Sequence, residues 1–206
     1  ANSNTAVGTN ALFTNTTGTF NVALGNGAMY ANTTGNNNVG IGKNSLDTNT
    51  TGGGNTAIGR DSLTANTTAN DNVAVGYTAL CENTTGANNT AVGNYSLRAN
   101  TTASSNTAVG MGSLNANTTG ASNVAVGLLA LNVNTTGSGN VSVGRDALRA
   151  NTTAGLNTAV GDCALLSNTT GDINAAFGAY ALRTNTTGSA NTAVGKNSLL
   201  ANTTAG

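Results

Sequence analysis

The chain has no histidine and very few charged side chains. Of its 206 residues only 7% are charged, and seven basic residues balance seven acidic ones. A typical globular protein carries about 25% charged residues, so the polarity here comes from Asn, Thr, Ser and Gly. Without histidine there is no Ser-His-Asp triad and no histidine-ligated metal. The balanced charge gives no long-range field that would attract a phosphate backbone, which predicts no nucleic-acid partner.

The sequence also lacks a long apolar run, paired cysteines and paired acids. No run reaches the roughly 18 residues of a membrane span, so this segment is predicted not to insert into a membrane. Cys81 and Cys163 lie five repeats apart, or roughly 24 Å at the spacing of stacked strands, which predicts two separate thiols. The acids are scattered, with no acid–base pair and no aspartate in every repeat to bind calcium. These absences predict a non-enzymatic protein without cofactor or metal.

The chain is a 17-residue unit repeated twelve times without insertion or deletion. One copy runs from Asn106 to Ser122, and we number its residues as positions 1 to 17. A constant short period is typical of stacked repeats, so residues 1–206 are predicted to form a single array. Neither terminal copy resembles a cap, which predicts either a fragment of a longer chain or an array continued end to end by other chains. The copies begin at Asn4, Asn21, Asn38, Asn55, Asn72, Asn89, Asn106, Asn123, Asn140, Asn157, Asn174 and Asn191.

The constrained positions of the unit predict one coil of an all-β, parallel β-solenoid. Position 1 is always Asn, position 2 mostly Thr or Val, position 3 small, position 4 mostly aliphatic and position 5 always Gly. This is typical of a short strand closed by a turn. The glycine indicates either a positive φ or a close backbone approach. Stacking would then form ladders of like residues, represented by Asn4, Gly8, Asn106, Gly110, Leu114 and Asn117.

The second half of the unit is less regular. Position 8 is Ala or Ser, position 9 is Leu except for Met29, and positions 12 to 14 are always Asn-Thr-Thr. The pair at 8 and 9 predicts either a tight bend or a single helical turn. Position 15 is Gly in eight copies and Ala in four, so no positive φ is predicted there. A helical solenoid is disfavoured, because seventeen residues with two turns leave no room for helices of about ten residues.

Charge and core size predict which residues face solvent and how the coils are stabilised. All fourteen charged residues occupy positions 6, 7, 10, 11, 16 and 17, which are therefore predicted to face solvent. Each coil offers two sizeable apolar side chains, at positions 4 and 9, worth about 1.5–3 kcal/mol each when buried. Ordering each backbone residue costs roughly 1–2 kcal/mol. The imbalance predicts that chains associate with one another.

The Asn-Thr-Thr triplet has three interpretations. The first is structural, with stacked amides and hydroxyls extending the ladder. The second is ice binding by a threonine array, although adjacent threonines of an extended strand point to opposite faces. The third is N-glycosylation, because each triplet matches the acceptor pattern. The acceptors would be Asn15, Asn32, Asn49, Asn66, Asn83, Asn100, Asn117, Asn134, Asn151, Asn168, Asn185 and Asn202.

The first half of the unit, as in Asn72-Val-Ala-Val-Gly-Tyr-Thr-Ala79, resembles the repeats of trimeric autotransporter adhesin heads. The longer form, Ala11-Leu-Phe-Thr-Asn-Thr-Thr-Gly18, is similar to repeats of phage tail-fibre-like and bacterial surface proteins. The resemblance covers all twelve copies, although their second half departs from the shorter adhesin unit. It implies a left-handed parallel β-roll assembled as a trimer, so a homotrimer is favoured over an end-to-end filament. It also implies an extracellular location, on a cell surface or a virion.

These observations together predict the structural shaft of an extracellular fibre or adhesin, which holds length and displays a tip. The alternative is a binding module whose Asn/Thr face recognises ice or a glycan. In neither case does the resemblance supply catalytic residues.

Overall fold

The computed structural model describes residues 3–206 and is all-β, with no helix among those residues. The predicted parallel β-solenoid is confirmed: each 17-residue copy contributes one coil and one strand of three residues. The coils belong to two compact units, Ala1–Ser105 and Asn106–Gly206, with six copies in each. The division between the units falls between two copies, so no coil is interrupted.

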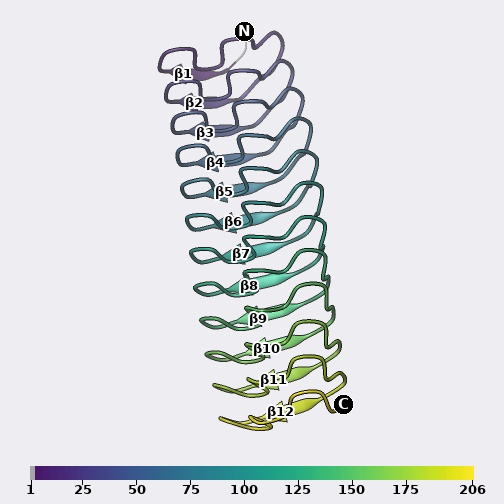
Figure 1. Ribbon diagram of the computed structural model, residues 1–206. Coiled ribbons are helices and arrows are strands. Elements are labelled where there is room, and N and C mark those ends of the chain that lie inside the picture. Colours follow the sequence, from purple (N-terminus) through teal and green to yellow (C-terminus); the bar gives the residue numbers. More distant parts are fainter. Residues whose placement is uncertain (1–2) are drawn as a thin grey trace. The chain divides into compact units, whose positions relative to one another are not determined.

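The strands occupy positions 2 to 4 of every copy (Figure 1). Those of the first unit are β1 (Thr5–Val7), β2 (Val22–Leu24), β3 (Val39–Ile41), β4 (Thr56–Ile58), β5 (Val73–Val75) and β6 (Thr90–Val92). Those of the second unit are β7 (Thr107–Val109), β8 (Val124–Val126), β9 (Val141–Val143), β10 (Thr158–Val160), β11 (Ala175–Phe177) and β12 (Thr192–Val194).

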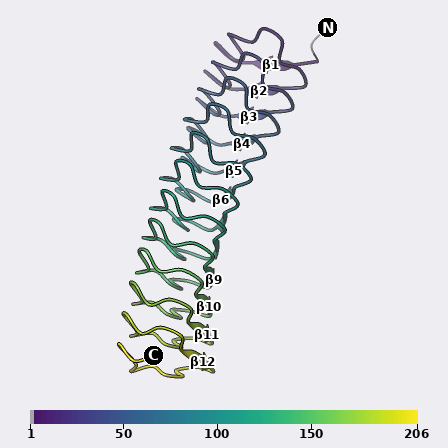
Figure 2. The same cartoon turned by 90° about the vertical axis from the view of Figure 1, so that its right-hand side faces the viewer.

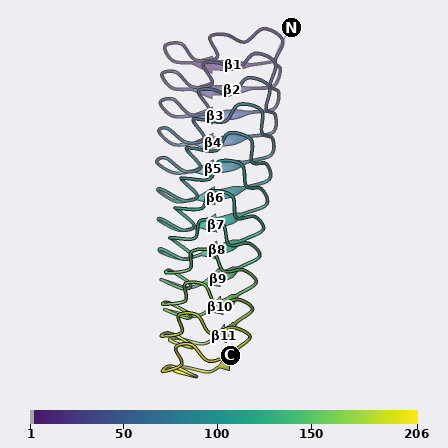
Figure 3. The ribbon, with the colours of Figure 1, turned by 45° about the vertical axis from the view of Figure 1, so that its right-hand side comes forward.

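Within each unit the strands pair in parallel and in chain order. Each residue pairs with the residue seventeen later, as Val75 does with Val92 in the first unit and Val126 with Val143 in the second. Figures 2 and 3 show the strands of each unit stacked one after another in chain order. Like residues therefore stack on like residues, as the strict period predicts.

Hydrogen bonds between coils continue around the whole circuit, outside the strands as well as within them. In the turn, the Met29 amide donates to the Ser45 carbonyl of the next coil at 2.9 Å. Beyond the turn, the Thr33 amide donates to the Thr50 carbonyl at 2.9 Å. Backbone groups buried without a partner are costly, and this ladder satisfies them in segments that have no regular strand geometry.

The segment at positions 6 to 11 is a succession of tight turns and not a helical turn. The residue at position 9, which is Met29 in one copy and leucine in the other eleven, has a left-handed backbone in every copy, with φ of 52° at Leu114 and 53° at Leu80. This conformation costs a residue with a Cβ about 1–2 kcal/mol, and burial of the side chain compensates for it, since Leu114 is 0% exposed. The repeated strain was not predicted, because leucine is not a residue that favours a positive φ.

The core is narrower than predicted. Strand residues alternate, so that position 3 points inward while positions 2 and 4 point outward. The prediction that position 4 supplies a second buried apolar side chain per coil is wrong: Ile58 is 37% exposed and Phe177 is 43% exposed. The interior holds the position-9 leucine, the small residues at positions 3, 8 and 15, and the asparagines at positions 1 and 12.

Two residues that depart from the repeat, Met29 and Gly40, compensate for each other in side-chain volume within this narrow core. Gly40 is the only glycine at position 3, and the coil before it has the only methionine at position 9. A Cβ added at Gly40 would lie 2.7 Å from Cγ of Met29. The longer, unbranched methionine therefore fills the space that an alanine methyl takes in other coils.

We expect Gly40→Ala to lower the free energy of unfolding by about 1–3 kcal/mol through overpacking. Adding Met29→Leu should restore most of that loss, because the Leu–Ala pair recreates Leu46 with Ala57 in the next coils. Urea denaturation of both single variants and the double variant would measure the coupling. Strictly additive effects would contradict the proposed compensation.

Candidate functional surfaces

The outward side of the strands carries a regular array of uncharged side chains. Position 2 is Thr, Val or Ala and position 4 is Val, Ile, Leu or Phe, and no charged residue occurs at either position in any copy. Side chains at both positions are exposed or half-buried, and they flank an inward residue at position 3. We call this array the strand face, and each unit has its own. Contiguous exposed apolar surface of this kind is typical of a surface that binds another molecule.

Two buried asparagine ladders run behind the strand face. At position 1, the Asn38 Nδ2 donates to the Gly52 carbonyl at 2.8 Å, and its Oδ1 accepts from the Asn55 amide at 2.9 Å. At position 12, the Asn49 Nδ2 donates to Asn32 Oδ1 at 2.8 Å. Asn38 and Asn49 are 0% exposed. Buried polar groups are stable only when they are hydrogen-bonded, so these asparagines are part of the core.

The six residues predicted to represent the ladder occupy such structural places. Asn4 and Asn106 donate from Nδ2 to the carbonyls of Gly18 and Gly120 at 2.8 and 3.0 Å. Asn117 also donates to Gly120, at 2.8 Å, and Leu114 is fully buried. Gly8 and Gly110 have φ of 133° and 130°, and an added Cβ would lie 2.5 Å from the carbonyl oxygen of the next glycine in the column. The position-5 glycine therefore has both a positive φ and a close approach to the backbone of the next coil.

The Asn-Thr-Thr triplet presents only one of its three side chains to solvent. Ten of the twelve predicted glycosylation acceptors, all except Asn15 and Asn202, are 0% exposed. Their Nδ2 atoms lie inside the asparagine ladder, so the folded coils present no accessible amide there. The first threonine bonds to the next coil, as Thr33 Oγ1 does to the Thr50 carbonyl at 3.0 Å. The second threonine, such as Thr34, forms an exposed column.

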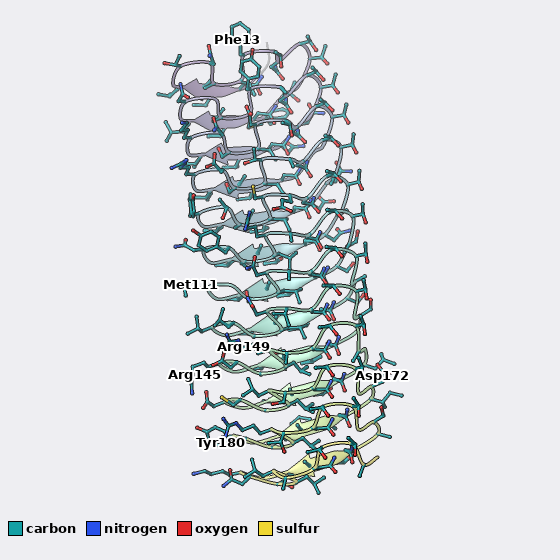
Figure 4. The ribbon with its side chains drawn as sticks, viewed as in Figure 1. Phe13, Met111, Arg145, Arg149, Asp172 and Tyr180 are labelled. Carbon is teal, nitrogen blue, oxygen red and sulfur yellow. The ribbon has the colours of Figure 1, made fainter. Side chains whose placement is uncertain are left out.

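Most of the positions that carry charged residues face solvent, as predicted. Figure 4 shows Met111 and Arg145 at position 6 and Asp172 at position 16 projecting from the coils. Position 7 is an exception, because its left-handed backbone directs the side chain partly inward, and the Asp146 side chain is only 13% exposed. Arg145 contacts Asp162 through two hydrogen bonds of 2.9 Å, which lowers the pKa of the Asp162 carboxyl.

The thiols and the potential metal ligands are the remaining chemical groups in the part of the chain that the structure describes. Cys81 and Cys163 are both free thiols. Burial raises the pKa of each, and a raised pKa lowers the fraction of reactive thiolate. Residues 3–206 contain no cluster of three or more potential metal ligands and no helix long and apolar enough to cross a membrane.

One cluster of side chains was missed by reading the repeat alone. Arg60, Asp61, Tyr77, Asn94 and Tyr95 come from positions 6 and 7 of three consecutive coils, and we call them the tyrosine cluster. The rings of Tyr77 and Tyr95 meet edge to face with centroids 5.4 Å apart. Positional averaging concealed the cluster, because it treats positions 6 and 7 only as variable. The sequence shows the cluster only when the residues at positions 6 and 7 are compared between consecutive copies.

Comparison with protein-family models, with curated proteins and with solved structures finds no match for this chain.

Proposed function

We propose that the segment is a structural shaft of an extracellular fibre, in which copies of the chain associate through their strand faces. The observation that carries this proposal is the outward column of aliphatic side chains at position 4. Water-exposed apolar area costs free energy in proportion to its size. A repeated, uncharged array is therefore better explained by a covering partner than by permanent exposure.

A second copy of the same chain is the partner that best fits the strand face. The face repeats every seventeen residues, and only a partner with the same repeat would match it coil for coil. The resemblance to trimeric adhesin heads supports three copies around one axis. The ladder between coils then gives the shaft its stiffness, because each coil is held to its neighbour around the whole circuit.

We expect the purified chain to sediment as a homotrimer, and the Ile58→Lys/Val75→Lys variant to sediment as a monomer. Both side chains point outward, so the substitutions place charge on the strand face without entering the core. Analytical ultracentrifugation measures the mass, and far-UV circular dichroism shows whether the coils stay folded. The matched control is Thr68→Lys/Thr85→Lys, which adds the same charge at the exposed threonine column of the same coils and should remain a trimer. A monomeric wild-type chain would contradict the proposal.

Ice binding by the strand face is the second candidate, and one observation favours it. An ice-binding threonine array would have two outward threonines flanking an inward residue on each strand. Positions 2 and 4 provide the backbone geometry, as with Thr90 and Val92 around Ala91, but only position 2 carries threonine. β-Branched side chains have few rotamers, so the array is rigid. If the wild-type chain is a monomer, inhibition of ice recrystallisation that is lost in the double lysine variant would favour this function.

A further inference from the structure

The tyrosine cluster interrupts the uniform surface of the first unit with chemistry that the repeat does not require. Tyr77 and Tyr95 are 37% and 41% exposed. Elsewhere the surface of these coils is composed largely of the aliphatic strand face and of Asn, Thr, Ser, Ala and Gly residues. Two large rings held at an angle of 88° form a corner with two apolar faces. An edge-to-face pair contributes about 0.5–1.5 kcal/mol beyond its buried area, yet much of each ring stays in water.

Charged and amide groups surround this aromatic corner. Arg60 lies with its guanidinium carbon 5.7 Å from the centroid of the Tyr77 ring, and its Nε donates to Asp61 Oδ2 at 2.9 Å. The Asp61 Oδ1 accepts from Asn44 Nδ2 at 3.1 Å, which holds the carboxylate in place. Asn94 Oδ1 accepts from the Tyr77 amide at 3.1 Å. The polar groups next to the rings are therefore positioned by neighbouring coils.

Several hydrogen-bonding groups of the cluster have no partner within the protein. Among the described residues, no group bonds to the hydroxyls of Tyr77 and Tyr95 or to the two Nη groups of Arg60. A tyrosine hydroxyl is both donor and acceptor, and a guanidinium has donors in a planar fork. The cluster thus combines unused donors and acceptors with exposed ring faces at one place.

We propose that the tyrosine cluster binds a short neutral oligosaccharide. A pyranose ring has an apolar C–H face that packs on an aromatic ring, and hydroxyls that pair with arginine, carboxylate and amide groups. Arg60 and Asp61 balance each other in charge, so the cluster does not favour an anion. Three coils span about 10 Å at the spacing of stacked strands, which is the length of about two sugar rings.

This inference is independent of the proposed shaft function. The tyrosine cluster lies at positions 6 and 7, outside the strand face at positions 2 and 4, so self-association and sugar binding use different side chains. A fibre with such a site would bind a glycan along its side. A monomer with the same site would bind the same glycan, so failure of one proposal leaves the other testable.

The test is a titration of the full chain with cellotetraose, maltotetraose, mannotetraose and chitotetraose, followed by calorimetry and by tyrosine fluorescence. The chain has no tryptophan and four tyrosines, so the fluorescence reports on few residues. We expect at least one of these sugars to bind with a Kd below about 1 mM. Tyr77→Ala and Tyr95→Ala should each weaken that binding about tenfold or more, whereas Tyr77→Phe should retain most of it.

The matched control is Tyr30→Ala. Tyr30 stacks on Phe13 with centroids 5.4 Å apart, and among the described residues the arginines that contact tyrosine rings lie over Tyr77 and Tyr180 instead. Sugar binding should be unchanged in this variant, and circular dichroism should be native in all of them. The proposal is overturned if none of the four sugars binds with a Kd below about 1 mM. It is also overturned if the Tyr77 and Tyr95 variants bind as well as the wild type, or if Tyr30→Ala weakens binding equally.

Discussion

Replacing Gly59 with alanine is expected to destabilise the first unit by at least about 4 kcal/mol, a loss far beyond that of an ordinary surface substitution. Gly59 is a position-5 glycine with φ of 129°, where residues with a Cβ are strained. Its Cβ would also lie 2.5 Å from the carbonyl oxygen of Gly76 in the next coil. The obstructing atom belongs to the backbone ladder, so it cannot move away without breaking hydrogen bonds between coils.

Hydrogen exchange is the appropriate measurement, because repeat arrays can unfold locally. We expect Gly59→Ala to abolish protection of amides in the coils that start at Asn55 and Asn72. Gly53→Ala is the control: its nearest neighbour would be the Asn36 carbonyl oxygen at 3.1 Å, and the same repeat position already holds Ala87 and Ala121. Equal protection in both variants would show that the repeated glycine is not a steric requirement.

The repeat makes the coil predictable because each residue stacks on the residue at the same position of the neighbouring coil. An invariant glycine such as Gly59 indicates a close approach that recurs in every coil. An invariant polar residue such as Asn38 indicates a buried ladder or an exposed column. The sequence distinguishes buried from exposed columns only partly. A charged residue indicates an exposed position, whereas an uncharged residue can lie in the core or at the surface. The parallel stacking and the glycine contacts could therefore be predicted, whereas the place of the aliphatic residues could not.

The direction of the position-4 side chain was not predictable from residue size. A strand of three residues directs one or two side chains inward, and an aliphatic pattern suggests that the large ones are buried. The left-handed turn instead directs Leu63 into the centre, and the asparagines occupy much of the remaining space. Only a small residue such as Ala57 then fits beneath the strand. The exposed face, which carries the proposed function, is thus a consequence of the turn.

We expect Asn38→Asp to reduce stability by about 3–5 kcal/mol at pH 7, because it buries an uncompensated charge without changing side-chain volume. The Asn38 Nδ2 donates to the Gly52 carbonyl at 2.8 Å, and a carboxylate oxygen there would face another acceptor. Only the protonated acid can donate to that carbonyl. The folded chain should therefore hold the proton more tightly than the unfolded chain, whose aspartate has a pKa of about 3.9.

The sign of the pH dependence follows from this difference. Above about pH 4 the unfolded chain releases the proton that the folded chain keeps, so the stability of Asn38→Asp relative to wild type should fall as pH rises towards 7. Urea midpoints between pH 4 and 7 would measure it. The control is Asn36→Asp at position 16, where Asp172 already accepts the Gly155 amide at 2.7 Å as Asn36 accepts the Thr19 amide. That variant should lose little stability at any of these pH values. Equal losses of stability in both variants would contradict the prediction that the buried position 1 requires an amide side chain more strictly than position 16 does.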